Sequence, residues 1–212
     1  MARGVYALLC SGLLVLALGS PASSVAAEPQ AAPTTLVRFH SPTQGPAQAP
    51  VTVVEFFDPA CEACRAYYPY VKNLLSRYPQ EVRLVLRYAP FHDGSDAVVR
   101  LLEASKRQGR YWQVLEALLA AQPQWADHHR PNIQNAYRTA EQAGLKLQQA
   151  LADAASPQVD AVMKQEMQDL AALKIIATPT FYVNGELVSG GPDQLAAVVA
   201  SKVVQAKAGG NR

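Results

Sequence analysis

The sequence predicts an α/β fold in which helices cover the faces of a mixed β-sheet. A nearly continuous apolar run, Val51–Phe57, is followed closely by helical periodicity over residues 65–78. A second strand and a long helical block come next. The dipeptide Asn184-Gly185 then joins two short strand-like segments, as in a β-hairpin, before a last amphipathic helix. This order of elements indicates that the helical block is inserted between two halves of one sheet.

The elements after the central strand can be placed by periodicity and by turn residues. Alternation of apolar and polar side chains predicts a strand over residues 81–88. Pro69 is expected to kink the helix over 65–78. Further helices are expected over 97–108, 111–121, 132–143, 145–154 and 157–173, strands over 180–183 and 186–188, and a final helix over 193–207.

The N-terminus has the pattern of a secretory signal peptide, predicted to span residues 1–27. Arg3 supplies a positive charge, residues 5–18 are apolar, and Val-Ala-Ala at 25–27 is a small-residue cleavage site. The apolar core of about 14 residues is shorter than the roughly 20 needed to cross a bilayer, which argues against an uncleaved anchor. We therefore expect an exported protein that is cleaved after Ala27.

Cleavage changes the cysteine count. Cys10 lies in the signal peptide, so only Cys61 and Cys64 of the three cysteines remain. A disulfide between them closes a very small loop and constrains the unfolded chain little. Such a disulfide is a poor stabiliser and a plausible reagent.

The mature chain is expected to form one folded domain. Residues 28–50 are rich in Ala, Pro, Gln and Thr, which predicts an extended, partly disordered lead-in with one edge strand at 36–39. The domain itself is expected over 51–207, with the helical insertion at about 95–173 and a flexible tail at 208–212. The formal net charge of the chain is +2, and the sequence shows no basic patch. No nucleic-acid partner is therefore predicted.

The tetrapeptide Cys61-Glu62-Ala63-Cys64 lies at a strand-to-helix junction. A helix N-terminus stabilises a thiolate, so thiol–disulfide exchange is the leading interpretation. A structural disulfide and half of a metal site are the alternatives. Soft thiolates suit Cu(I), but no methionine lies near the motif, and a zinc site would need two more ligands.

Together these features resemble a known family. The Cys-x-x-Cys motif, Pro69, the pair Thr178-Pro179 before a strand, the hairpin and the closing helix resemble the thioredoxin fold. The helical insertion, with the run 55–57 ahead of the cysteines, resembles the DsbA-like exported thiol:disulfide oxidoreductases. The resemblance covers about residues 50–207. It implies a thioredoxin fold with an inserted helical domain, and an enzyme that forms or exchanges disulfides in other proteins.

The resemblance also implies partners and a location. The expected location is the periplasm. The expected partners are cysteine-containing exported proteins as substrates and a membrane redox partner. No cofactor and no metal are expected, and the protein is expected to be a monomer.

Two site residues follow from the motif, and three more from the resemblance. Cys61 should be a partly exposed thiolate at the helix N-terminus, and Cys64, one turn further, should resolve the mixed disulfide. The resemblance implies that Glu55 helps to move the proton of the buried thiol; a strand-end residue facing water is the alternative. It also implies that Pro179 is cis and that the backbone of Thr178 pairs with an extended substrate.

The two residues between the cysteines are expected to modulate the redox potential. Glu62, followed by Ala63, adds a negative charge beside Cys61, which should raise the pKa of that thiol and make the disulfide less oxidising. Thr178 before the proline also resembles the exported isomerases, although residues 28–50 are too short for their dimerisation domain. A disulfide isomerase or reductant, kept reduced by a membrane partner, is therefore the alternative function.

The histidines are less informative. His92 is expected in the turn that leads into the next helix, with a place at the border of the site as the alternative. His128 and His129 are expected in a solvated loop. His40 lies in the lead-in, where the sequence shows no partner for it.

Overall fold

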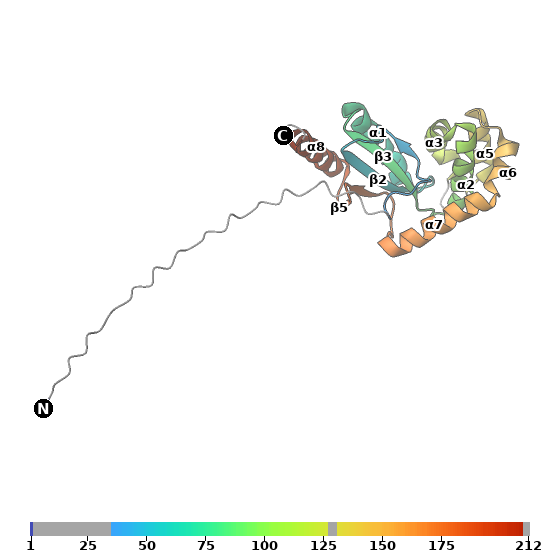
Figure 1. The fold of residues 1–212 in the computed structure, drawn as a ribbon. Helices are drawn as coiled ribbons and strands as arrows, with labels where there is room; N and C mark the ends of the chain where they lie inside the picture. Colours follow the sequence, from blue (N-terminus) through green and yellow to red (C-terminus); the bar gives the residue numbers. More distant parts are fainter. Residues whose placement is uncertain (2–34, 127–130, 210–212) are drawn as a thin grey trace.

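A computed structural model describes residues 1, 35–126 and 131–209 (Figure 1). The predicted signal peptide after Met1, the beginning of the lead-in, the loop with His128 and His129, and residues 210–212 lie outside the described residues. Within the described part, no helix is both long enough and apolar enough to cross a membrane.

The core of the fold is a five-stranded mixed sheet with the order β1-β3-β2-β4-β5. β2 (Val51–Phe57) lies at its centre, parallel to β3 (Val82–Tyr88) and antiparallel to β4 (Thr180–Val183). β4 and β5 (Glu186–Val188) form the predicted hairpin. Every residue of β2 is buried, as expected for a strand covered on both faces.

The predicted edge strand at 36–39 is wrong. Those residues form turns, and the short edge strand is β1 (Thr43–Gln44), which pairs antiparallel with β3. Leu36 is instead buried against one face of the sheet. Its carbonyl and that of Thr35 accept hydrogen bonds from the Arg87 guanidinium, so this backbone is satisfied without strand pairing.

Helices cover the two faces of the sheet. α1 (Glu62–Arg77) and α8 (Pro192–Gly209) pack on the face that carries Val53 and Phe57. The lead-in and the end of α7 (Pro157–Leu173) cover the face that carries Val54, Phe56 and Val85. α1 runs through Pro69 as one helix, so the proline does not end it.

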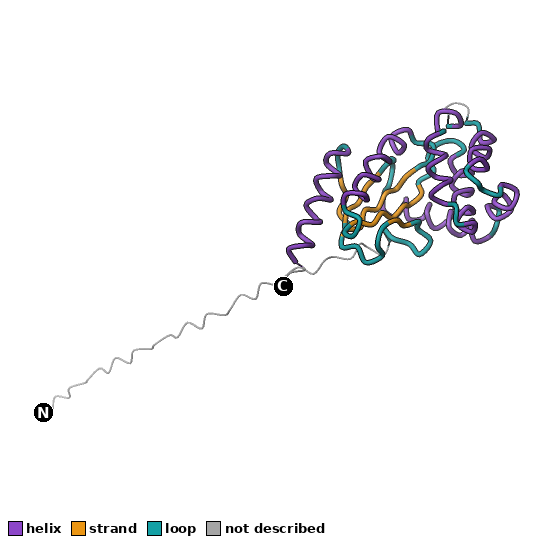
Figure 2. The backbone as a smooth tube through the Cα atoms, turned by 90° about the horizontal axis from the view of Figure 1, so that it is seen from above, coloured by secondary structure: helices purple, strands orange, loops and turns teal. Residues whose placement is uncertain are grey.

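The helical insertion lies beside the sheet (Figures 1 and 2). Its predicted helices are all present, with two differences: the first ends as a 3-10 turn, and an extra helical turn, α4, follows α3. The elements are α2 (Ser95–Ser105), the 3-10 turn Lys106–Gln108, α3 (Tyr111–Ala120), α4 (Gln122–Trp125), α5 (Ile133–Gln142) and α6 (Leu147–Ala154), leading into α7.

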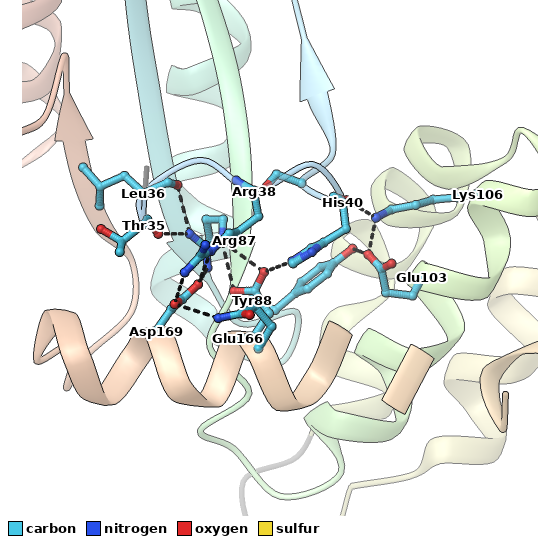
Figure 3. A network of polar contacts seen from close by, with 12 residues as sticks. Thr35, Leu36, Arg38, His40, Arg87, Tyr88, Glu103, Lys106, Glu166 and Asp169 are labelled. Carbon is cyan, nitrogen blue, oxygen red and sulfur yellow. Dashed lines mark hydrogen bonds and ion pairs between the residues drawn. The ribbon is translucent and has the colours of Figure 1, made fainter. Parts of the chain in front are cut away.

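A buried charge network joins the sheet, α7 and the lead-in (Figure 3). The Nε atom of Arg87, on β3, lies 3.0 Å from each carboxylate oxygen of Glu166, and its Nη2 atom lies 2.5 Å from Oδ2 of Asp169. Arg38 also donates two hydrogen bonds to Asp169. His40 lies 2.7 Å from Glu166, which supplies the partner that the sequence did not show.

Candidate active site

The two cysteines of the motif lie where β2 gives way to α1. Cys61 is the N-cap of α1, with extended backbone angles of φ −73° and ψ 121°. Both cysteines are thiols in this structure, with Cys61 6% and Cys64 2% exposed. The Cys61 thiol lies 3.4 Å from the carbonyl oxygen of Thr178.

The surroundings of Cys61 favour its thiolate. A hydrogen bond from Cys64 is the largest cause that lowers the Cys61 pKa, from 9.0 to about 5. Burial opposes this shift, whereas the Thr178 side chain and the backbone N–H groups of Ala63 and Cys64 add to it. The unpaired N–H groups of a helix N-terminus thus contribute as expected.

The surroundings of Cys64 favour its neutral thiol. Burial, first of all, raises the pKa of Cys64 far above its usual range, and the hydrogen bond to Cys61 and the charge of Glu55 act in the same direction. The backbone N–H of Asp58, 3.5 Å from Sγ, lowers it. The partial exposure expected for Cys61 is not found, because both cysteines are buried. A thiolate and a neutral thiol therefore lie against each other.

Glu55 lies behind the cysteines on the face of the sheet that α1 covers. It pairs in register with Leu86 on one side and Phe181 on the other, and it is 3% exposed. Burial raises the Glu55 pKa from 4.5 to about 8, and the charge of Cys61 adds to this. Glu55 therefore does not point to water, and it can hold a proton near neutral pH.

The Thr178-Pro179 segment reaches the site from the other end of the chain. Its peptide bond is cis, as the resemblance implies. β4 begins directly after it, at Thr180, which pairs with Phe56 of the central strand. The sheet thus holds this segment against Cys61.

The residues between the cysteines, Glu62 and Ala63, are exposed on the first turn of α1. Ala63 contributes its backbone N–H to the Cys61 thiolate. Both side chains therefore lie at the surface next to Cys61.

Asp58, fully buried three residues before Cys61, is a further residue of the site that the sequence did not single out. Its carboxylate accepts hydrogen bonds from the backbone N–H groups of Ala60 (2.8 Å), Phe91 (2.7 Å) and His92 (2.9 Å), and from the Ser95 hydroxyl. His92 lies in the predicted turn before α2, with Nδ1 2.8 Å from the Asp58 carboxylate. An acidic residue directly after a buried strand was the available signal.

Among the described residues, no group of three or more His, Cys, Asp or Glu side chains is arranged to hold a metal ion.

Comparison with known proteins identifies the family. A family model described as thioredoxin matches residues 37–200. The chain belongs to the thioredoxin family. A thioredoxin-like oxidoreductase from Silicibacter pomeroyi is 32% identical, and the match covers 82% of this chain and 96% of that one, with a TM-score of 0.69.

More distant structures share the fold. BdbD from Bacillus subtilis is 20% identical, with 77% of this chain and 93% of that one covered and a TM-score of 0.69. Wolbachia pipientis α-DsbA1 is 14% identical, with 82% and 96% covered and a TM-score of 0.70. The predicted DsbA-like architecture, a thioredoxin fold with a helical insertion, is confirmed.

Two curated relatives are much longer proteins. They are the Na(+)/H(+) antiporter NhaA of Herminiimonas arsenicoxydans, 28% identical, and NhaA 3 of Salinispora tropica, 32% identical. The matches cover 80% and 77% of this chain but only 26% and 25% of the relatives. The chain thus spans about a quarter of the length of these relatives.

Proposed function

We propose that this protein is an exported thiol:disulfide oxidoreductase that forms or exchanges disulfides in other proteins through Cys61 and Cys64. One observation carries the proposal: Cys61, with a pKa lowered to about 5, begins a helix and lies against a buried thiol whose pKa is raised. A structural bridge would not require this difference between its two sulfurs. The thioredoxin family membership supports the same reaction.

In the oxidising direction, a substrate thiolate attacks Cys61 of the disulfide form. The Cys61–Cys64 bond breaks, a mixed disulfide forms, and Cys64 leaves as a thiolate that takes up a proton. A second substrate thiolate then attacks the substrate sulfur, and Cys61 leaves as its stabilised thiolate. The substrate loses two electrons and the protein gains them; reduction is the reverse sequence.

Three further residues have roles in this proposal. Glu55 supplies the proton to the departing Cys64 thiolate, because burial keeps it protonated near neutral pH. Thr178 and Pro179 present the backbone along which an extended substrate segment aligns. Both roles require the placement beside the cysteines described above.

The opposite working direction has its own supporting observation. Glu62 is exposed immediately beside Cys61, where a negative charge would disfavour a thiolate and make the disulfide less oxidising. The expected rise of the Cys61 pKa is not seen, because other groups lower it to about 5. An isomerase or reductant kept reduced by a membrane partner is therefore the second candidate. The proposed setting is the same for both: a monomer in the periplasm that acts on cysteine-containing exported proteins.

The deciding measurement is the reduction potential of the Cys61–Cys64 pair against glutathione. A value near about −120 mV identifies a disulfide donor, and one of about −200 to −270 mV an isomerase or reductant. Cys64→Ser should accumulate mixed disulfides with substrate proteins, whereas Cys61→Ser should form none. If Cys61→Ser exchanges disulfides as fast as the wild type, the proposal is wrong.

A further inference from the structure

The helical insertion contacts the redox motif through one side-chain amide. Gln122, at the start of α4, is 1% exposed. Its Nε2 atom donates hydrogen bonds to the carbonyl oxygens of Pro59, at 2.8 Å, and Cys61, at 3.0 Å. A residue of the insertion thus holds the backbone on both sides of Ala60, directly before the helix that carries the thiolate.

The orientation of this amide is fixed by chemistry. Both neighbours are carbonyl oxygens, which can only accept hydrogen bonds, so the NH₂ group must face them. The amide oxygen of Gln122 is then buried, with no hydrogen-bond partner among the described residues. A buried acceptor without a partner is unfavourable, and a leucine would avoid that cost. The two hydrogen bonds to the backbone of the redox segment offset this cost for Gln122.

Gln122 and Asp58 hold the same segment by complementary groups. Gln122 binds carbonyls, whereas the Asp58 carboxylate accepts the N–H of Ala60 between them. The Cys61 carbonyl also accepts the N–H of Arg65, at 3.1 Å, which is the first hydrogen bond of α1. The polar backbone groups of this segment are therefore held from two sides, by the sheet connection and by the insertion.

We propose that Gln122 is a positioning residue for disulfide exchange, through which the helical insertion holds the backbone of Cys61 at the start of α1. The inference rests on the proposed function above. The two bonds keep Cys61 in its N-cap conformation, with its sulfur near the N–H groups of Ala63 and Cys64 at the start of α1. This placement stabilises the reduced, ionised form.

The test is Gln122→Leu, which removes the donor and keeps a similar volume. Ultraviolet absorbance of the thiolate, with Cys61→Ser as the reference, should show the Cys61 titration midpoint rising by about one pH unit. The equilibrium constant with glutathione should shift roughly tenfold toward the disulfide, a potential about 30 mV more negative. The shift of the titration midpoint and the shift of the potential must agree in direction and size, because both report the stability of the Cys61 thiolate.

The matched control is Asn135→Leu in α5. Nδ2 of Asn135 also donates to a backbone carbonyl of the insertion, that of Gln124 at 2.8 Å, away from the redox segment. This variant should lose stability without moving the Cys61 midpoint. If Gln122→Leu lowers stability but leaves the midpoint and the potential unchanged, Gln122 is merely structural and the proposal is overturned.

Two measures keep the test decisive if Gln122→Leu does not fold. Gln122→Met is less demanding of its surroundings and carries the same expectation. In the wild type, the NMR signals of the Gln122 side-chain NH₂ group should shift with the Cys61 titration; signals that do not respond overturn the proposal. The titration needs no substrate, so it can succeed or fail independently of whether the protein exchanges disulfides.

Discussion

The backbone N–H of Asp58 lies 3.5 Å from the sulfur of Cys64, and this contact favours ionisation of the buried thiol. In the proposed exchange reaction, Cys64 is the sulfur that briefly carries negative charge when the disulfide opens. The donor that meets this charge belongs to a residue whose own side chain is tied to the loop before α2. The geometry of the inner cysteine therefore depends on that loop.

We predict that Asp58→Asn destabilises the protein by about 2–4 kcal/mol. One carboxylate oxygen accepts from Ala60 and Ser95, and the other from Phe91 and His92. An amide presents an NH₂ group to one of these sets of donors, in a fully buried position. Urea unfolding at neutral pH should show a lower midpoint with an unchanged slope. Asp93→Asn, exposed in the same loop, is the control and should stay within about 0.5 kcal/mol of the wild type.

The thiolate of Cys61 should depend on Cys64. The hydrogen bond from Cys64 is the largest cause of the Cys61 pKa of about 5, so Cys64→Ala should raise the titration midpoint by at least one pH unit. Absorbance titration of the reduced proteins measures this directly. An unchanged midpoint would mean that Thr178 and the helix N-terminus stabilise the thiolate without help from Cys64.

The same shift predicts how the stability of the reduced protein varies with pH. The folded-state Cys61 pKa of about 5 lies below the unfolded value of 9.0, so the folded state binds fewer protons between them. This contribution to stability is complete above pH 9 and is lost as the pH falls toward 5. Unfolding midpoints of reduced wild type and Cys61→Ser should therefore diverge as the pH rises through this range. Parallel curves would contradict the depressed pKa.

Glu55 should show the opposite dependence. Burial raises its pKa from 4.5 to about 8, so the folded state binds more protons in this range and stability falls as the pH rises. Glu55→Gln should remove this cost and gain as much as roughly 4 kcal/mol at pH 8, but nothing at pH 4.5. Denaturant unfolding should measure the free energy of unfolding of the reduced variant and the reduced wild type at both pH values. Cys61 titrates in both proteins, so its contribution is present on both sides of the comparison.

Glu55→Gln should also slow disulfide opening, because the departing Cys64 thiolate loses its proton donor. Stopped-flow kinetics of reduction by a small thiol would measure this. An unchanged rate across pH 6–9 would remove Glu55 from the mechanism, whatever its effect on stability.

The sequence predicted the parts of this fold that local patterns encode. The buried strand before the motif, the helix after it and the Asn184-Gly185 hairpin each have a signal within a few residues. The edge strand failed for the same reason: the apolar run around Leu36 has a strand-like composition, but it packs on the sheet face while Arg87 satisfies its backbone. Nothing near residue 36 indicates this distant guanidinium.

The residues of the site differ in the same way in how far the sequence predicts them. The spacing of Cys61 and Cys64 predicts their role, whereas Thr178 is placed beside them only by the resemblance to a known family. Gln122 binds only backbone carbonyls, which any residue could supply, and Asp58 binds mostly backbone N–H groups beside the side chains of Ser95 and His92. The acidic residue after the strand hints at Asp58, but no pairing of side-chain types indicates Gln122. Their partners become apparent only when the insertion and the loop before α2 are placed in space.

The buried charge network makes a last prediction, for Arg87→Met. Arg87 is fully buried, and its removal takes a guanidinium from both Glu166 and Asp169 (Figure 3). His40 still contacts Glu166, and Arg38 and Gln165 still donate to Asp169. A buried charge that loses its partner is expensive, so we expect a loss of about 3–5 kcal/mol in the free energy of unfolding.

Lys72→Met is the matched control for Arg87→Met. It removes an ion pair with Glu116 in which both side chains are nearly half exposed, at 46% and 44%, and it should cost less than about 1 kcal/mol. Urea unfolding at neutral pH compares the two variants. Equal losses would show that the network contributes no more than a surface pair. A large loss for Arg87→Met alone would show that this network fastens α7, and with it the helical insertion, to the sheet.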